Sequence, residues 1–300
     1  MTSEHHQNRG PGVPSPTALL MLRRVVLPLV RLCFRPTLEG TQHLPKDRPY
    51  LLVSNHNAGL GLAEILCFSA LWAEAFGAGR PIAGYAHPLG FRVWPVTALH
   101  RLFGTIPSTY EAAYHALAEG VPILMFPGGD HETLRPIWQA NRVDFGGRKG
   151  FLRIAAKSGV PIVPMGIHGS HYTAPMLIRG KWIAWLLLLP RGLGIKRWAL
   201  TLLGVLGCVG IAALPLGIWP RVGLAYLWLA SPLVLLPWIP WTIRFRIGEP
   251  IQNERLFQAV GVDDDLENAL DGVEKRIQAL VTTKSFQMNG SPNDGKEGVD

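Results

Sequence analysis

The stretch PYLLVSNHNAGLGLAE, residues 49–64, decides the fold. Its apolar run, Pro49 to Val53, is typical of a buried strand and ends abruptly in four polar residues, 54–57. Glycine-spaced apolar sequence begins at Gly59 and continues with helical spacing, which predicts a strand, a tight loop and a helix start. The sequence therefore predicts an α/β fold that presents polar side chains at a strand end, where functional residues are often found.

A histidine and a carboxylate in this stretch are candidates for acid–base chemistry. His56 can take a proton from a hydroxyl near neutral pH if an acid holds its other ring nitrogen. Glu64, eight residues further on, is the nearest such acid. On this stretch alone, an ordinary loop histidine and a solvated helix glutamate explain the pattern equally well.

Composition and charge point to a lipid or another anionic partner. Hydrophobic residues make up 48% of the chain and charged residues only 17%, and the mean hydropathy is positive. The net charge of +8 favours phospholipid head groups, nucleic acid or a polyphosphate carrier such as coenzyme A. Helix-turn-helix, RNA-recognition and zinc signatures are missing from the sequence, so a nucleic-acid partner is not expected. Three widely separated cysteines predict neither a disulfide framework nor a metal site.

The two ends of the chain predict disordered tails, at 1–16 and 284–300, because both are polar and rich in small or charged residues. Between them, residues 17–36 are apolar but carry Arg23, Arg24 and Arg31. That pattern suits an amphipathic helix on anionic lipid, and an ordinary first helix of the domain suits it equally.

Residues 182–241 predict a hydrophobic membrane hairpin. Two runs without charge, 198–220 and 222–243, are each long enough to span a bilayer and meet at Pro220–Arg221. The hairpin is flanked by Arg191, Lys196, Arg197, Arg244 and Arg246, which outnumber the single Arg221 at its tip, and this predicts that both ends face the cytoplasm. A kinked hairpin that dips into one leaflet is the main alternative, and a buried soluble core is a further one.

Two glycine-rich loops are candidate binding elements. The strand predicted at 122–126 runs into Pro127, Gly128 and Gly129, where backbone amides can approach a ligand closely. Arg148 and Lys149 stand beside glycines at a predicted helix start, which is typical of an anion site. A plain turn and a solvated basic cap are the structural alternatives.

Four stretches, taken in order, carry a family resemblance. They are NH at 55–56 with an acid downstream, FGTIPSTYEA at 103–112, FPGGDHE at 126–132 and VPIVP at 160–164. They resemble the four blocks of the phospholipid and glycerolipid acyltransferase family, of the lysophosphatidic acid acyltransferase type. The FPGG form resembles the branch shared with diacylglycerol and wax or phytyl ester acyltransferases. The resemblance covers roughly residues 45–170.

The resemblance implies roles for particular residues. In that family the first-block histidine is the general base that activates the acceptor hydroxyl, which implies this role for His56. Gly61 stands where the family has its orienting Asp, so Glu64 is the substitute by position. The family blocks also imply substrate binding at Asn55, Gly104, Phe126, Pro127, Gly128, Gly129 and Asp130.

Two departures concern the acceptor. Gly128 and His131 replace a Glu and an Arg that contact the acceptor's phosphate in the family. Phosphate binding would then fall to Arg135, Arg148 or Lys149, unless the acceptor is a neutral lipid alcohol. The amides of Gly128 and Gly129 are candidates to stabilise the oxyanion.

The resemblance implies a mixed central sheet flanked by helices, as in glycerol-3-phosphate acyltransferases. The expected divisions are a core at 37–181, the hairpin at 182–241 before the last strand, and that strand with a helical part at 242–283.

We expect a membrane-associated O-acyltransferase of phospholipid metabolism that needs no metal or cofactor beyond acyl-CoA or acyl carrier protein as donor substrate. Its expected partners are membrane lipids, and its expected location is the cytoplasmic face of the inner or plasma membrane. A neutral-lipid acyltransferase, a lipid thioesterase and an inactive lipid-binding homologue are the alternatives.

Overall fold

The computed structural model describes residues 10–57, 59, 61–92, 94, 96–192, 194–256 and 262–283 of the 300-residue chain. Of the predicted tails at 1–16 and 284–300, residues 1–9 and 284–300 lie outside the described residues. Residues 10–15 lie against the core, where the Gly12 amide donates to the Gly104 carbonyl at 2.8 Å. Residues 10–15 therefore belong to the folded core and not to a tail that reaches residue 16.

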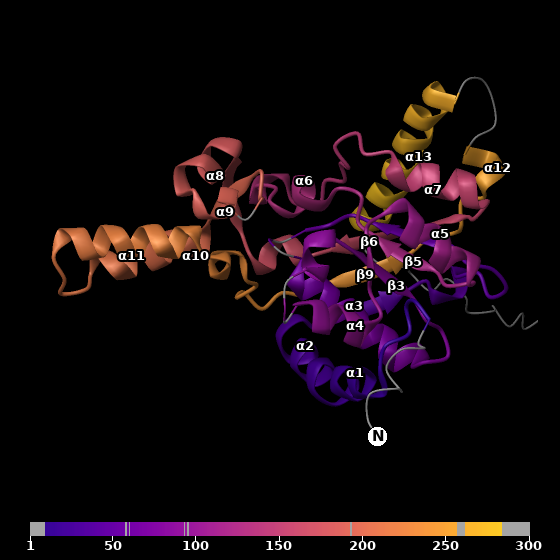
Figure 1. Ribbon diagram of the computed structural model, residues 1–300, viewed down its shortest axis with the longest axis horizontal. Coiled ribbons are helices and arrows are strands. Elements are labelled where there is room, and N and C mark those ends of the chain that lie inside the picture. Colours follow the sequence, from indigo (N-terminus) through magenta and orange to yellow (C-terminus); the bar gives the residue numbers. More distant parts are fainter. Residues whose placement is uncertain are drawn as a thin grey trace, which may run out of the picture.

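The centre of the molecule is a seven-stranded mixed sheet with strand order β1-β9-β6-β2-β5-β3-β4 (Figure 1). Its strands are β1 (Thr37–Glu39), β2 (Leu51–Ser54), β3 (Ala83–Ala86), β4 (Ile106–Pro107), β5 (Ile123–Met125), β6 (Ile162–His168) and β9 (Arg244–Ile247). Neighbouring strands are parallel except β6 and β9, which are antiparallel. The predicted α/β fold with a mixed central sheet is confirmed.

Strand β2 is central, between β6 and β5, and it positions the loop that follows it. Leu51, Leu52 and Val53 are all fully buried, which explains an apolar run without alternation. Val53 pairs with Met125 of β5 and with Pro164 of β6. The loops after β2 and β5 therefore leave the sheet at the same edge, which brings the first and third sequence blocks together.

Helices cover both faces of this sheet (Figure 1). They are α1 (Pro16–Met21), a π-helical turn (Leu22–Val26), α2 (Leu27–Phe34), α3 (Leu62–Phe76), α4 (Val96–Phe103), α5 (Tyr110–Ala118), α6 (Gly129–Thr133), α7 (Gly150–Ser158), α12 (Asn253–Leu256) and α13 (Val262–Thr282). Leu51 and Val53 pack with α5, α7 and α13, whereas Leu52 packs with α2 and α3. Because side chains alternate along a strand, one short strand anchors two separate cores.

A smaller unit follows β6. It contains the two-stranded antiparallel sheet of β7 (Met176–Gly180) and β8 (Trp198–Thr201), with α8 (Lys181–Leu187) and α9 (Leu189–Gly192) between them. The helices α10 (Leu202–Ala212) and α11 (Ile218–Ala230) then form a hairpin that extends from the body of the molecule (Figure 1). Trp198, Ala230 and Val234 join the base of this hairpin to the small sheet in a third apolar core.

Across the described residues, no helix combines the length and the apolar character needed to cross a bilayer. The helices α10 and α11 contain 11 and 13 residues, or about 17 and 20 Å at ~1.5 Å per residue, against ~30 Å of hydrocarbon. The two uncharged runs thus do not form the two spanning helices predicted. The hairpin turn lies at 213–217, not at Pro220–Arg221, because Pro220 is accommodated in the first turn of α11.

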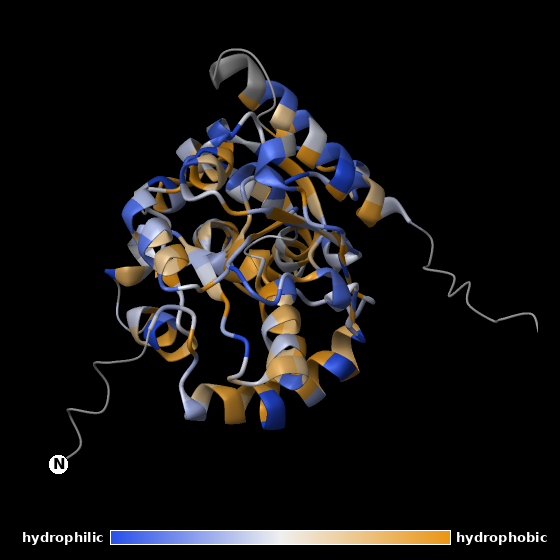
Figure 2. Ribbon diagram, turned by 90° about the vertical axis from the view of Figure 1, so that its right-hand side faces the viewer, coloured by the Kyte–Doolittle hydropathy of each residue, from blue (hydrophilic) through white to orange (hydrophobic). Residues whose placement is uncertain are grey.

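The α10–α11 hairpin and the first helices, α1 and α2, nevertheless expose apolar side chains. On α11 these include Ile218, Trp219 and Val222, and on the first helices Leu29 and Leu32. Figure 2 shows orange, hydrophobic segments along the helices at the lower edge of the molecule, interrupted by blue polar ones. Arg246, counted in the sequence as a membrane-flanking cation, instead lies buried in β9 and pairs with Glu39 at 3.2 Å.

Candidate active site

His56 lies in the loop directly after β2, with 13% of its side chain exposed. Its Nδ1 is 2.5 Å from Oε1 of Glu64, in the first turn of α3, and the Glu64 side chain is fully buried. The ring also stacks on Phe126, with ring centroids 4.3 Å apart. Held on one nitrogen and one face, the imidazole has Nε2 left to exchange a proton.

The carboxylate of Glu64 is fixed by further donors. The Asn57 amide donates to Oε1 at 2.7 Å, and the Ser170 hydroxyl donates to Oε2 at 3.2 Å. The Asn57 side chain donates in turn to the Ser170 hydroxyl at 3.0 Å. Sequence reasoning missed Asn57 and Ser170, and Ser170 comes from the 3₁₀ turn Ser170–Thr173 after β6, 106 residues from Glu64.

Gly61 explains why the acid stands at position 64. A Cβ added at Gly61 would lie 2.0 Å from Cε1 of His56, and the residue has φ +66°, which favours glycine. An Asp at this position is incompatible with the observed ring. The longer Glu64 side chain, which starts three residues further along the chain, reaches Nδ1 of His56.

A second displaced carboxylate lies behind Gly128. A Cβ there would lie 2.2 Å from both Cγ and Oε2 of Glu132, so glycine makes room for the Glu132 side chain. Glu132 accepts hydrogen bonds from the backbone amides of His56 at 2.9 Å and Asp144 at 3.1 Å. It also accepts from Arg135 Nη2 at 3.1 Å. Glu132 thus ties the third block to the histidine loop.

The Glu132–Arg135 ion pair is buried, with side chains 0% and 1% exposed. Burial raises the pKa of Glu132, whereas Arg135 and the two backbone amides lower it and favour the charged carboxylate. Arg135 is therefore paired with a carboxylate inside the protein and is not exposed to solvent. Its binding of an acceptor phosphate stays a prediction, with Nη1 unpartnered among the described residues.

The other predicted cations are also paired. Arg148 donates to the carbonyl of Pro127 at 3.1 Å and bonds with Asp130. Burial alone would raise the pKa of Asp130, but Arg148, with further help from Arg197, lowers it below its ordinary value. Lys149 pairs with Glu267 of α13, away from the histidine loop.

Three predicted binding positions have structural partners instead. Asn55 is fully buried and exchanges two hydrogen bonds with the backbone of Ile167, at 2.8 and 2.9 Å. The Gly129 amide donates to the Phe126 carbonyl at 3.2 Å, so it is committed to a turn and is not free for an oxyanion. Gly104 precedes β4, at the edge of the sheet opposite His56, and the structure does not bring it to the site.

His171 is a further histidine that sequence reasoning left without a role. It follows Ser170 directly and is 2% exposed, and both of its ring nitrogens lack a hydrogen-bond partner among the described residues. Burial lowers the pKa of His171 to about 3, and the nearby charges of Arg135 and His56 act in the same direction.

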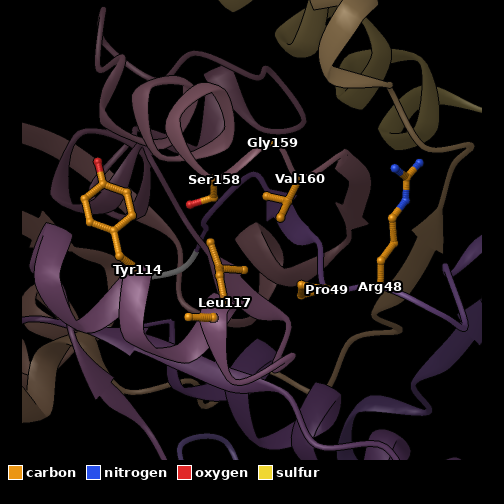
Figure 3. Close-up of a pocket in the computed structure, with 8 residues that line it drawn as sticks. Arg48, Pro49, Tyr114, Leu117, Ser158, Gly159 and Val160 are labelled. Carbon is orange, nitrogen blue, oxygen red and sulfur yellow. The ribbon is translucent and has the colours of Figure 1, made fainter.

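The pocket drawn in Figure 3 does not include His56 or Glu64. In the described ranges, no group of three or more His, Cys, Asp or Glu side chains is placed to hold a metal ion. The pocket, of about 330 Å³, is lined by Pro49, Tyr114, Leu117 and Val160 (Figure 3). Pro49 and Val160 precede β2 and β6, so the pocket opens at the sheet edge opposite His56.

The chain is similar to known proteins both in sequence and in fold. Residues 35–168 match the model of the family described as Acyltransferase. The fold resembles the crystal structure of the 1-acyl-sn-glycerophosphate (LPA) acyltransferase PlsC from Thermotoga maritima. The TM-score is 0.50 at 17% identity, over 89% of this chain and 81% of that one.

Sequence relatives include uncharacterised and plant proteins. An uncharacterised protein of Mycobacterium tuberculosis is 30% identical over 196 residues, which are 64% of this chain and 53% of the relative. Phytyl ester synthase 2 of Arabidopsis thaliana is 29% identical over 141 residues, 44% of this chain and 19% of that protein. The chain thus spans about half the length of its mycobacterial relatives and a fifth of the plant enzyme.

Proposed function

We propose, from the premise that residues 35–168 match the Acyltransferase family model, that the protein transfers a fatty acyl group from a thioester donor to a lipid hydroxyl. The observation that carries the proposal is the His56–Glu64 contact of 2.5 Å at the end of the central strand. A base held in one orientation by a buried acid is the group that an activated thioester requires, since no covalent nucleophile is needed.

The reaction follows from that contact. His56 Nε2 takes the proton of the acceptor hydroxyl while the acceptor oxygen forms a bond to the thioester carbonyl carbon. The carbon–sulfur bond then breaks, and the leaving thiolate recovers the proton from the imidazolium. Glu64 fixes the ring and stabilises the imidazolium between the two steps. Acyl-CoA and acyl carrier protein both supply the required thioester.

The acceptor that the site favours is an uncharged lipid alcohol. Gly128 lacks a carboxylate, and Arg135 and Arg148 are already paired with Glu132 and Asp130. A phosphorylated acceptor such as a lysophospholipid would have to compete with Asp130 for Arg148, and could bond with Arg135 only through the buried Nη1. The similarity to phytyl ester synthases supports the same choice.

Product analysis tests the function. The purified protein would receive labelled acyl-CoA or acyl carrier protein with diacylglycerol, a long-chain alcohol or lysophosphatidic acid. We expect labelled ester with the uncharged acceptors in excess over lysophosphatidic acid. Free fatty acid alone would identify a hydrolase, and lipid binding without either product would identify a non-catalytic protein.

We propose a membrane-surface location, which the exposed apolar residues of the α10–α11 hairpin and of α1 and α2 support; the cytoplasmic face stays a prediction. Their exposed apolar residues adjoin exposed arginines such as Arg23 and Arg24, as expected for a protein that binds anionic lipid from one side. Helices of 11 and 13 residues are long enough to enter one leaflet.

Vesicle sedimentation tests that location. Replacing Ile218, Trp219 and Val222 by serine is expected to weaken binding to anionic vesicles roughly tenfold or more, because each contributes apolar area to the bilayer. Trp138, which is 67% exposed outside the hairpin, provides the matched control when replaced by serine. Equal loss in the control, or undiminished binding by the triple variant, would contradict the proposal.

A further inference from the structure

The burial of His171 is destabilising, because neither ring nitrogen makes a hydrogen bond among the described residues. A buried polar group without a hydrogen bond is destabilising, and such groups in folded proteins call for an explanation. Both nitrogens of His171 lack a partner among the described residues. His168, three residues earlier, shows the ordinary case, since its Nδ1 lies 3.1 Å from the carbonyl oxygen of Val281.

The position of His171 connects it with the reacting centre. Its neighbour Ser170 donates to Glu64, which holds His56. Burial first, and then the charges of Arg135 and His56, lower the pKa of its ring, so both of these groups are near enough to act on it. Oδ1 of Asn57 and Nη1 of Arg135 are also buried and unpartnered in the described part of the chain. These unfilled hydrogen-bonding positions belong to three segments that are tied to the histidine loop, since Glu132 links Arg135 to the His56 amide and Ser170 bonds with Asn57 and Glu64.

The reaction needs a donor at this place. The carbonyl oxygen of the thioester gains negative charge as the acceptor oxygen attacks, and a preorganised donor lowers the barrier. Of the two backbone donors predicted from the sequence, the Gly129 amide is committed to the Phe126 carbonyl, which leaves only that of Gly128. A histidine that stays uncharged keeps one N–H for donation and does not compete with His56 for the proton.

We propose that His171 is a hydrogen-bond donor of the site, and that its neutral ring donates to the thioester carbonyl oxygen in the transition state. The inference rests on the proposed acyl transfer. It assigns the electrophilic role to His171 and leaves the basic role with His56.

The decisive variant is His171→Leu, which removes both nitrogens and keeps an apolar side chain of moderate size. We expect kcat to fall roughly 10²- to 10³-fold with little change in KM. The melting temperature should stay equal or rise by a few degrees, because an unpaired buried polar group is removed. His171→Gln, which retains a donor, should recover part of the lost rate. The combination of lost turnover and retained stability separates a functional group from a packing group.

The matched control is His168→Leu. It removes a hydrogen bond to the α13 backbone, so its melting temperature should fall while kcat stays within about twofold of wild type. An active His171→Leu enzyme, or one that unfolds at a markedly lower temperature than wild type, would overturn the inference. A wild-type protein that forms no ester would instead reject the proposed function, and the inference with it.

The pH dependence of stability gives an independent readout. The unfolded chain protonates His171 near its ordinary pKa of 6.5, whereas in the fold burial, Arg135 and His56 hold the pKa near 3. Stability present above pH 6.5 is therefore lost as the pH falls from 6.5 toward 3. Between pH 7 and 5 the melting temperature of the wild type should fall more than that of His171→Leu. Parallel curves would show that the ring is not buried in a neutral form.

Discussion

Replacing His56 by alanine is expected to lower kcat for acyl transfer by roughly 10²- to 10⁴-fold, the usual contribution of a positioned general base. The variant should stay folded, since the ring lies in a loop, partly exposed and stacked on one face only. Ester formation from labelled donor and lipid alcohol measures the loss. His115→Ala, on the exposed side of α5, is the control with unchanged rate. Wild-type turnover by His56→Ala would remove the basis of the proposed chemistry.

Glu64→Gln completes this comparison. The amide keeps the shape of the side chain but not the charge that stabilises the imidazolium. Turnover should therefore fall roughly tenfold or more, while the affinity for the donor stays nearly intact. Unchanged turnover would reject Glu64 as the group that orients His56. Gly61→Asp offers no rescue, because its Cβ would collide with the ring.

Local pattern was enough to predict the central part of the fold. The run 49–53 predicted a buried strand, and the helical spacing after the loop predicted a helix, which is observed as α3 (Leu62–Phe76). Once parallel strands are assumed, the loops after β2 and β5 must share an edge. The proximity of His56 to Phe126 follows from that topology, and Glu64 followed from being the nearest downstream acid.

The rest of the site depends on contacts between distant residues. In sequence, Glu132 and Arg135 look like solvated charges of a short helix, and only tertiary structure buries them as a pair. The displacement of two carboxylates, from 61 to 64 and from 128 to 132, becomes visible only when an added Cβ is tested against its neighbours. No sequence pattern can show that His171 lacks partners.

The hairpin was misjudged because hydropathy does not distinguish a helix from a strand. Uncharged residues in 198–201 form β8 and pack against the small sheet, which leaves only part of each run for a helix. The arginines that flank the runs are likewise not equivalent, since Arg246 is buried within the sheet and Arg197 lies near Asp130. A count of charges in the sequence treats Arg197 and Arg246 as unpaired cations beside the membrane.

Removing the Glu132 side chain is expected to cost the largest free energy of unfolding of any single change in the site. Glu132→Ala leaves the Arg135 guanidinium buried without its carboxylate and the amides of His56 and Asp144 without an acceptor. Loss of one partner from a buried pair typically destabilises by about 3–5 kcal/mol. Urea unfolding followed by circular dichroism measures the change.

An exposed pair gives the comparison that decides the cause. Asp130 and Arg148 are 42% and 43% exposed, so Asp130→Ala should cost only about 0–1 kcal/mol. If the buried charge is the problem, adding Arg135→Met to Glu132→Ala should recover part of the loss, because the uncompensated cation is removed. The residual loss then measures what the two backbone amides contribute, including the one that fixes His56. If Glu132→Ala were as stable as Asp130→Ala, the Glu132–Arg135 pair would not hold the histidine loop. The inference that Glu132 links the stability of the fold to the position of His56 would then be wrong.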